Sequence, residues 1–457
     1  MKKYDVLVIG AGAGLEVVSF AADKGMSVAI IEEGPLGGTC LNRGCIPSKI
    51  LIHSADVVET IKNSEKFGVK STIEKIDFAS IVKRVNEIVD TDAGNIEKSI
   101  KESENPTLYK MHGKFIGPKQ MQVGDPSAGS GQVEQIEAEK VFIVGGTRPT
   151  IPPIPGLETT PYLDSTKALR LEKQPEHLIV IGGGYIAAEL AHFYGTLGTK
   201  ITILVRGNHM LSDEDEEIAD WFTKEFSNKY EILFNTQAES VSYQNDKFTI
   251  TLKESEKKLE SDQLLVVTGR VPNTDILDVK ATGVAVDDKG YIKVNEYLET
   301  NVEGIWAFGD ILGILPFRHT ANDQAGISLR NAFTDKKVPF DPFAIGHAVF
   351  SSPQVAGVGK TEQQLKKEGI TYKVGRAELK DTGMGGALQE NGLVKVLADD
   401  TGQKILGVHI IGPQASILIH EAIVAMKSSS NVSAITNSVY IHPALPEWLQ
   451  RAFFAIE

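Results

Sequence analysis

The two cysteines of this chain of 457 residues, Cys40 and Cys45, lie in one short motif, GGTCLNRGCIPSK. Pro47 favours the first turn of a helix, so we expect Cys45 at a helix N-terminus and Lys49 one turn further along. A helix N-terminus and a nearby ammonium both lower the pKa of a thiol, which would make Cys45 a thiolate near neutral pH. The spacer and the neighbouring glycines allow both thiols to close a small disulfide ring. The motif therefore predicts a redox pair.

The cysteine pair has two other interpretations. A zinc site is the main rival, but structural zinc sites need four ligands and short spacings, and the chain has no second cysteine pair. Two inert buried thiols are the other alternative, which the flanking glycines and lysine disfavour. We therefore predict that no metal is bound.

A second set of reactive side chains lies near the C-terminus, in the segment HPALPE, which contains His442 and Glu447. Thiol–disulfide exchange needs a group that takes up and returns a proton, and histidine titrates close to neutral pH. A nearby carboxylate such as Glu447 can orient the imidazole and stabilise its protonated form. Taken alone, a histidine such as His442 is more often structural than catalytic.

Composition narrows the class of protein. Lys and Arg number 47 against 60 Asp and Glu, which gives a net charge of −13, and no basic cluster stands out. A nucleic acid or an anionic membrane is therefore not expected as a partner. No apolar run near the start is long enough for a signal peptide or a membrane span, so we expect a soluble, cytoplasmic protein. In such a reducing compartment, paired cysteines indicate a metal or redox site more than a structural disulfide.

The elements that must position these residues begin with a dinucleotide-binding unit at the N-terminus. A strand, a glycine-rich turn, a helix, a second strand and an acid follow one another: Val6–Ile9, then Gly10, Gly12 and Gly14, residues 16–24, Val28–Ile31 and Glu32. In such a unit the helix N-terminus faces a pyrophosphate and the acid binds ribose hydroxyls. Leu15 stands where a third glycine is usual, so this match alone is imperfect.

A second unit strengthens the prediction. The strand Leu178–Ile181 is followed by the turn of Gly182, Gly184 and Ala187, a helix and a strand over residues 200–206. Two such units predict two dinucleotides. The second strand ends at Arg206 in place of an acid, and an arginine there can pair with a 2′-phosphate. This favours NADP over NAD, with a solvated surface arginine as the alternative.

With the cysteine motif, the two units resemble the FAD-dependent pyridine nucleotide-disulfide oxidoreductases (class I), and the resemblance spans the whole chain. The family includes dihydrolipoyl dehydrogenase, glutathione reductase, mycothione reductase and mercuric reductase. The resemblance implies that Cys40 attacks the substrate, that Cys45 stacks on the flavin and that His442 with Glu447 is the acid/base pair. It also implies a Lys49–Glu189 pair near the flavin ring.

The cofactor contacts implied by the resemblance are spread along the chain. Tyr185 resembles the residue that covers the flavin until nicotinamide displaces it. Asp310 closes a segment, TNVEGIWAFGD, that is similar to the second FAD motif of the family. The cofactors expected are FAD and NADP or NAD. The expected cofactor-binding residues are Gly10, Gly12, Gly14, Glu32, Gly38, Thr39, Lys49, Gly113, Asp310, Arg318, His319, Gly182, Gly184, Tyr185, Ala187, Arg206 and Gly269.

These anchors predict an α/β chain with two Rossmann-like dinucleotide-binding domains, for FAD and NAD(P), and a C-terminal α+β dimerisation domain. The expected domains are 1–149 for FAD, 150–273 for NAD(P), 274–343 for the second part of the FAD domain and 344–457 for the interface. A helical pair at about 50–105 interrupts the first domain. The turn-rich residues 124–131 are expected to join two antiparallel strands, and Met384–Gly386 to form a loop.

Two substrates remain open. Dihydrolipoyl dehydrogenase fits the apolar segment Val17–Phe20, which could line a channel for a lipoyl chain. An NADPH-dependent reductase of a low-molecular-weight disulfide, of the mycothione reductase type, fits Gly14–Leu15, Arg206, GPQAS at 412–416 and HPALPE. We favour the first because that activity is more widespread. A redox-sensing or docking flavoprotein subunit is the alternative of another class.

The expected partners are a small dithiol or disulfide, or a lipoyl-bearing protein, and a second copy of the chain. His442 lies about 400 residues from Cys45, on the segment that resembles the family's dimer interface. We therefore expect a homodimer with shared active sites, each taking its cysteines from one subunit and His442 with Glu447 from the other.

Overall fold

The computed structural model describes residues 1–124, 133–253, 255 and 257–457, and the chain divides into two compact units. The first unit contains residues 1–48, 82–150 and 269–342, and the second contains 49–81, 151–268 and 343–457. The unit boundaries after 150, 268 and 342 lie close to the predicted limits at 149, 273 and 343. Residues 49–81 group with the second unit, whereas the prediction put them inside the segment 1–149.

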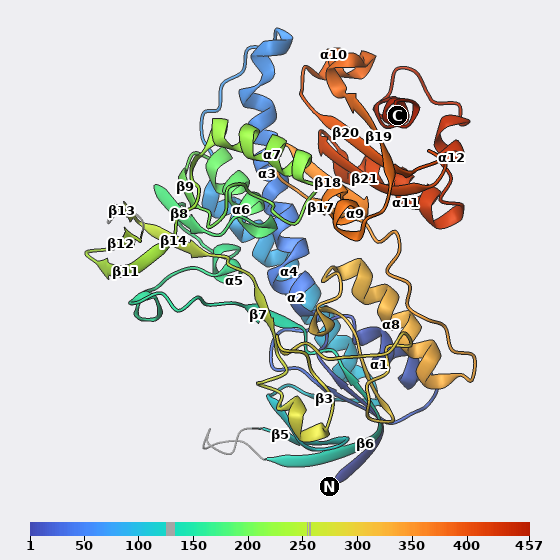
Figure 1. The fold of residues 1–457 in the computed structure, drawn as a ribbon. Helices are drawn as coiled ribbons and strands as arrows, with labels where there is room; N and C mark the ends of the chain where they lie inside the picture. The colour runs from blue at the N-terminus through green and yellow to red at the C-terminus, as the bar shows by residue number, and fades with distance from the viewer. Residues whose placement is uncertain (125–132, 254, 256) are drawn as a thin grey trace. The chain divides into compact units, whose positions relative to one another are not determined.

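The first unit is built on a largely parallel sheet with the strand order β3-β2-β1-β6-β5-β4 and with β16 beside β6 (Figure 1). Val6–Ile9 at its centre is at most 2% exposed, as expected for an apolar run in a strand covered on both faces. Strands β7 and β15 pair with each other as a separate two-stranded ribbon. The strands are β1 (Lys2–Ile9), β2 (Val28–Ile31), β3 (Pro106–Tyr109), β4 (Gly113–Gly117), β5 (Gln120–Val123), β6 (Glu134–Ile143), β7 (Thr147–Pro149), β15 (Arg270–Pro272) and β16 (Ile305–Ala307).

The helices of this unit place two residues of the predicted lipoyl-channel segment in the core. They are α1 (Leu15–Asp23), α2 (Gly38–Arg43) and α8 (Arg318–Phe333), while α3 (Cys45–Lys62) and α4 (Phe78–Glu102) continue into segments of the second unit. Helix α1 packs against β1, β2 and α8. Val17 and Val18 are 0% and 3% exposed, and the ring of Phe20 packs on Phe333 at 5.2 Å. Val17 and Val18 are used for packing and do not line a channel, whereas Ser19 is exposed and Phe20 is partly buried.

The predicted turn at residues 124–131 falls mostly on residues 125–132, which lie outside the described part of the chain. The strands on either side are β5 and β6, which pair antiparallel with Val123 opposite Glu134. The prediction that this stretch joins two antiparallel strands is therefore confirmed by its flanks.

The second unit contains a parallel sheet with the order β10-β9-β8-β14 and an antiparallel sheet with the order β11-β12-β13. Its strands are β8 (His177–Ile181), β9 (Lys200–Leu204), β10 (Glu231–Leu233), β11 (Ala238–Gln244), β12 (Lys247–Leu252), β13 (Lys258–Ser261) and β14 (Gln263–Val266). Its helices in this part are α5 (Ser165–Ala168), α6 (Tyr185–Thr196) and α7 (Glu216–Lys229). Helix α6 connects β8 to β9 directly, which is the predicted second strand–turn–helix–strand unit.

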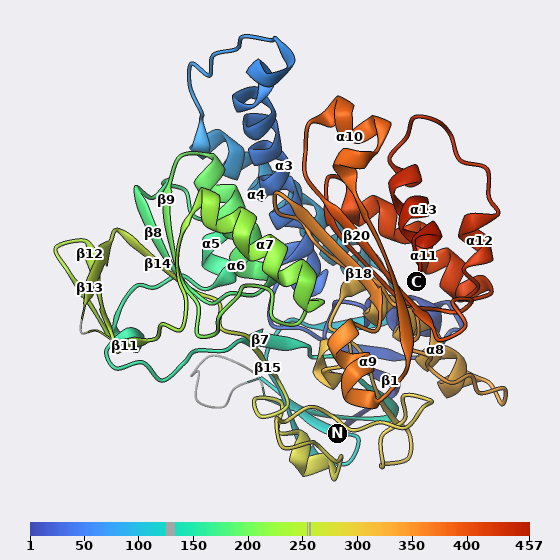
Figure 2. The ribbon, with the colours of Figure 1, turned by 45° about the horizontal axis from the view of Figure 1, so that its top comes forward.

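The C-terminal part of the second unit is an antiparallel sheet, β17-β18-β21-β20-β19, against which α11 and α13 pack (Figure 2). Its strands are β17 (His347–Val349), β18 (Gln354–Gly359), β19 (Tyr372–Glu378), β20 (Leu393–Asp399) and β21 (Ile405–Gly412). Its helices are α9 (Glu362–Glu368), α10 (Gly383–Leu388), α11 (Ala415–Ser428), α12 (Ser433–Thr436) and α13 (Pro446–Phe454). Met384–Gly386 thus lies in a helix, not in the predicted loop, because Thr382 caps it by accepting the Gly385 N–H. Among the described residues, no helix is long and apolar enough to span a bilayer.

Candidate functional site

The cysteine motif forms two consecutive helices in the first unit. Helix α2 begins at Gly38 and carries Thr39 and Cys40, and α3 begins at Cys45, as predicted. Both cysteines are thiols in the structure and partly exposed, and Cys40 is hydrogen-bonded to Cys45. This hydrogen bond, followed by burial, raises the pKa of Cys40 above its ordinary value. The two thiols are therefore adjacent, as formation of a disulfide between them requires.

Helix α2 starts directly against the first glycine turn. Gly10 has φ +106°, and a Cβ there would lie 2.4 Å from the carbonyl oxygen of Val144, so only glycine fits. A Cβ on Gly38 would lie 2.6 Å from the Cα of Gly12. No side chain caps α1, whose N-cap is Gly14, so its N-terminus is open to an anion. The helix that carries Cys40 and the first glycine turn are thus in close contact.

Glu32, directly after β2, stabilises this turn by hydrogen bonds. Its two carboxylate oxygens accept the N–H groups of Ala11 and Gly34, each at 2.9 Å. Each carboxylate oxygen has two lone pairs, so both can still accept a ribose hydroxyl. The predicted ribose contact is compatible with this second, structural use of the same side chain.

Two further predicted cofactor residues of the first unit carry charge. A guanidinium nitrogen of Arg318, the first residue of α8, would lie 3.8 Å from a Cβ on Gly12. Its positive charge acts to lower the pKa of Cys40, against the larger effects of Cys45 and burial. Asp310 accepts the hydroxyl of Thr147 at 3.3 Å, and burial raises the pKa of this carboxyl. Arg318 and Asp310 are therefore suited to phosphate and hydroxyl groups, respectively.

The remaining predicted residues of the first unit are held by packing. Gly113 lies in β4, where a Cβ would come within 2.7 Å of Ile31 Cγ2. The ring of His319 stacks on Phe317 with centroids 5.4 Å apart. Gly269 has φ +124°. The N-termini of α1 and of α6, which follow the two glycine turns, are not capped by side chains. Together with Glu32 and Arg318, these residues fit dinucleotide cofactors.

The second glycine turn follows β8. A Cβ on Gly182 would lie 2.3 Å from the carbonyl oxygen of Val267, and Gly184 is the N-cap of α6 without a side-chain cap. Ala187 is fully buried inside α6. Arg206, two residues beyond β9, is exposed, where a 2′-phosphate could reach it.

The predicted Lys49–Glu189 pair is present. The Lys49 ammonium donates to both carboxylate oxygens of Glu189 at 2.8 Å, and the Phe350 N–H donates to Oε1 at 3.0 Å. The Lys49 ammonium also lies 4.6 Å from the ring centroid of Phe350. Glu189 is 11% exposed, so this pair is more firmly held than a surface ion pair.

The sequence did not predict the partners of Tyr185. Its hydroxyl donates to a carboxylate oxygen of Glu214, and His347 Nε2 donates to the other oxygen at 2.9 Å. The side chain of Glu214 is 0% exposed. Because Glu214 lies in the acidic run SDEDEE, its pattern is that of a solvated surface segment, and only the tertiary structure identifies its role.

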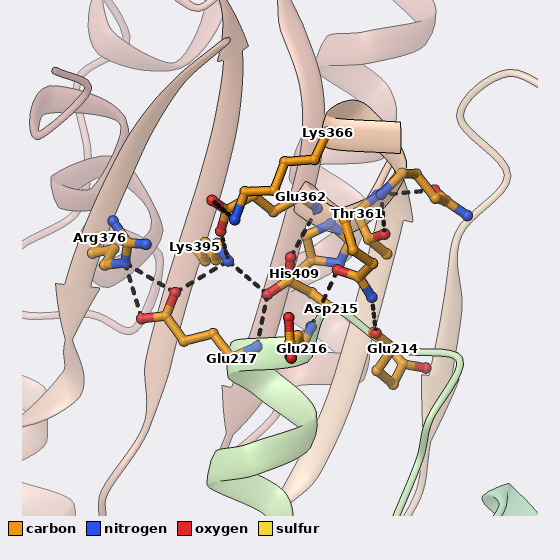
Figure 3. A network of polar contacts seen from close by, with 12 residues as sticks. Glu214, Asp215, Glu216, Glu217, Thr361, Glu362, Lys366, Arg376, Lys395 and His409 are labelled. Atoms are coloured by element: carbon orange, nitrogen blue, oxygen red, sulfur yellow. Dashed lines mark hydrogen bonds and ion pairs between the residues drawn. The ribbon is translucent and has the colours of Figure 1, made fainter. Parts of the chain in front are cut away.

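The same acidic run contributes to a buried network around Lys395 on β20 (Figure 3). The Lys395 ammonium donates to Glu362 at 2.6 Å and to Asp215 at 2.7 Å, and it lies 3.1 Å from Glu217. Burial acts to lower the pKa of Lys395, but its carboxylate partners outweigh burial and raise it. Arg376 donates to Glu217 at 2.9 Å. This network fixes the N-terminus of α7 to the C-terminal sheet.

His442 and Glu447 form the predicted pair within the second unit. His442 Nδ1 lies 2.9 Å from Glu447 Oε1, and Oε2 accepts the Ala444 N–H at 3.0 Å. The hydrogen bond from His442 is the main cause that lowers the pKa of Glu447. His442 is 74% exposed, so its ring is available to a group outside this unit.

One cluster of the described residues has metal-ligand chemistry. Ligand atoms of Asp56, Glu59 and His192 lie within 4.8 Å of one another. The Lys229 ammonium donates to Glu59 at 2.6 Å, and His192 Nε2 is 2.9 Å from Asp56. An ammonium already supplies the positive charge at this cluster, so the structure gives no reason to place a metal ion there.

Two models of one protein family match the chain. Residues 4–325 match the family model described as pyridine nucleotide-disulphide oxidoreductase, and residues 345–453 match the dimerisation domain of that family. The chain is 34% identical over 466 residues to mycothione reductase of Mycobacterium tuberculosis, with 100% of each covered. It is 35% identical over 478 residues to dihydrolipoyl dehydrogenase of Cupriavidus necator, covering 100% of this chain and 98% of that protein.

Solved structures show the same similarity. The Cu(II) complex of HOCl-induced flavoprotein disulfide reductase RclA from Escherichia coli is 29% identical, with a TM-score of 0.88 and 99% of each chain covered. A second structure of HOCl-induced flavoprotein disulfide reductase RclA from Escherichia coli aligns with a TM-score of 0.87 at 29% identity, over 99% of this chain and 100% of that chain.

Proposed function

Because the chain belongs to the pyridine nucleotide-disulphide oxidoreductase family, we propose that it passes electron pairs between NAD(P)H and a small disulfide through Cys40 and Cys45. The observation that carries this proposal is the hydrogen-bonded thiol pair, with Cys40 on the helix α2 that starts against the first glycine turn and Cys45 at the start of α3. The predicted family resemblance, the α/β fold class with its C-terminal dimerisation domain and the use of FAD with NAD(P)H are confirmed.

The bound cofactors supply hydride from the nicotinamide and a flavin that converts it into an electron pair for sulfur. The proposed work of the protein is to hold them. In the first unit, the open N-terminus of α1 with Glu32 and Arg318 would bind FAD. Lys49 and Glu189 form a fixed ion pair in the second unit. In the second unit, the open N-terminus of α6 would bind the NAD(P) pyrophosphate.

The proposed exchange at sulfur balances two electrons and two protons. The Cys40 thiolate attacks one sulfur of the substrate disulfide, and the leaving thiolate takes a proton from His442. Cys45 then loses its proton and attacks Cys40, which closes the Cys40–Cys45 disulfide and releases the second substrate thiolate. That thiolate takes up the proton that Cys45 lost. The electron pair from NAD(P)H reduces that disulfide again. Glu447 holds the imidazole and favours its protonated form.

Between the two substrate classes, we now favour reduction of a low-molecular-weight disulfide by NADPH. Arg206 is exposed after β9, in the position of the ribose-binding acid, and the buried Val17 and Val18 remove the support for a lipoyl channel. Dihydrolipoyl dehydrogenase activity is the second candidate, and the similarity to several proteins of that name supports it. A redox-sensing subunit is the third candidate.

The assay that separates these candidates uses the FAD-loaded protein. It is offered several low-molecular-weight disulfides with NADPH or NADH and, in the opposite direction, dihydrolipoamide with NAD+ or NADP+. We expect the fastest turnover with NADPH and one of the disulfides. Faster turnover with dihydrolipoamide and NAD+ would select the second candidate, and absence of turnover with every pair would favour a sensor.

The Arg206→Glu variant tests the cofactor assignment in that assay. If Arg206 pairs with a 2′-phosphate, we expect kcat/KM for NADPH to fall roughly tenfold or more, because an attraction becomes a repulsion. The value for NADH should change little. Lys200→Glu is the matched control, since Lys200 is exposed at the opposite end of the same strand. Equal losses with NADPH and NADH would show that Arg206 does not contact the phosphate.

The dimerisation domain supports a homodimer. Exposed apolar side chains are present in this domain on α11 and before His442, namely Ile417 (65%), Val424 (66%), Val439 (100%) and Ile441 (81%). We propose that the two subunits share their active sites, with His442 and Glu447 acting on the cysteines of the partner.

A further inference from the structure

Tyr185 stands at the start of the helix that follows the second glycine turn. It is the first residue of α6, directly after the N-cap Gly184. The Leu211 N–H donates to the carbonyl oxygen of Gly183 at 2.8 Å, so the segment that contains Glu214 is bonded to the same turn. A dinucleotide whose pyrophosphate binds at this helix N-terminus lies next to the first residue of the helix.

Tyr185 is held on two sides. Its hydroxyl donates to the buried carboxylate of Glu214, and its ring stacks on His347 with centroids 6.0 Å apart and planes 18° apart. His347 donates to the other oxygen of Glu214, so both oxygens are engaged. Burial acts to raise the pKa of Glu214, but these hydrogen bonds outweigh it and lower the pKa, so Glu214 is a permanent anion at neutral pH.

The Glu214 carboxylate cannot follow Tyr185 freely, because its backbone is fixed on both sides. Gln363 donates to the Glu214 carbonyl oxygen at 2.7 Å. The next residue, Asp215, accepts the ammonium of Lys395 at 2.7 Å and the Glu362 N–H at 3.0 Å (Figure 3). A displacement of the tyrosine ring therefore has to break its bond to Glu214 and cannot carry Glu214 along.

We propose that Glu214 is a positioning residue that anchors the hydroxyl of Tyr185, so that binding of the nicotinamide dinucleotide must break the Tyr185–Glu214 hydrogen bond. The anchor thereby lowers the affinity for the dinucleotide and keeps the ring in one position when the site is empty. This inference rests on the proposed function, because it places the NAD(P) site at the second glycine turn.

A double-mutant cycle on binding tests the anchor. Dissociation constants of NADP+ and NAD+ are measured by calorimetry on the oxidised, FAD-loaded protein, where no electrons are transferred. We expect Tyr185→Phe to tighten binding roughly tenfold, since a hydrogen bond to a charged group no longer has to be broken. Glu214→Gln should tighten binding by a smaller factor, because a neutral acceptor holds the hydroxyl less strongly. In the Tyr185→Phe background, Glu214→Gln should have no further effect.

Glu216→Gln is the matched control, since it removes an exposed carboxylate from the same segment and should leave both dissociation constants unchanged. An effect of Glu214→Gln that is equal with and without the tyrosine hydroxyl would reveal a merely structural role and overturn the proposal. Should Glu214→Gln not fold, unchanged or weaker binding by Tyr185→Phe would also overturn it.

Failure of the proposed function gives a different result. If the dinucleotide binds but NADPH does not reduce the protein, the redox assignment fails while the cycle still decides the anchor. If no dinucleotide binds to the wild-type protein, both proposals are wrong.

Discussion

Replacing Cys45 by serine is expected to abolish disulfide turnover, by roughly a thousandfold or more, while FAD remains bound. A hydroxyl cannot attack the mixed disulfide at Cys40, so the second substrate thiol would not be released. The measurement is turnover per bound flavin in the NADPH assay. Ser48→Ala is the control in the same helical turn, because the Ser48 hydroxyl only donates to the Cys45 carbonyl oxygen at 3.2 Å.

The spectrum of the reduced protein distinguishes the roles of the two thiols. If Cys45 lies beside the flavin, two-electron reduction of the wild-type protein should produce a long-wavelength absorbance from its thiolate. Cys45→Ser should lose this absorbance, whereas Cys40→Ser, which cannot form the disulfide, should show it already before reduction while losing turnover. Normal turnover by Cys45→Ser, or loss of the absorbance only in Cys40→Ser, would contradict the assignment.

The second large effect is expected in mixed dimers. Subunits with Cys45→Ser and subunits with His442→Ala are each inactive as homodimers in this account. In a heterodimer of the two, shared sites leave one site with both defects and the other intact. The heterodimer should therefore recover about half of the wild-type activity per dimer, given independent sites.

The reciprocal heterodimer is the control. It pairs a wild-type subunit with a subunit that carries both substitutions, so that each shared site contains one defect. It should be inactive, whereas sites contained within single chains would leave it half active. An inactive first heterodimer together with a half-active second one would refute shared sites.

The parts of the fold that the sequence predicted depend on local rules. Val6–Ile9 is apolar because both faces of its strand are covered. Position 10 requires glycine because a Cβ there would collide with a carbonyl oxygen. Both requirements are visible in the sequence itself. Helix α3 begins at Cys45 for the equally local reason that Pro47 fits its first turn. The Lys49–Glu189 pair is a long-range contact, and it was available only through the family resemblance.

The parts that escaped prediction depend on distant segments. Glu214 and Asp215 belong to an acidic run that looks solvated. Asp215 binds Lys395, 180 residues further along the chain, and Glu214 binds Tyr185 and His347. The apolar character of Val17 and Val18 does not reveal whether these side chains pack on a neighbouring helix or face a ligand. The sequence therefore predicts a channel lining where the structure has core packing. Local patterns thus predict the two glycine turns, whereas the contact between Tyr185 and Glu214 is visible only in the tertiary structure.

The central claim is that electrons from NAD(P)H reach the Cys40–Cys45 pair. Counting thiols tests it directly, because the chain contains only these two cysteines. The air-oxidised, FAD-loaded protein is denatured and alkylated before and after anaerobic treatment with NADPH, and the labels are located by mass spectrometry. The account predicts no label before treatment and one label on each cysteine afterwards. Two labels on the oxidised protein, or none after treatment with NADPH or NADH, would contradict it.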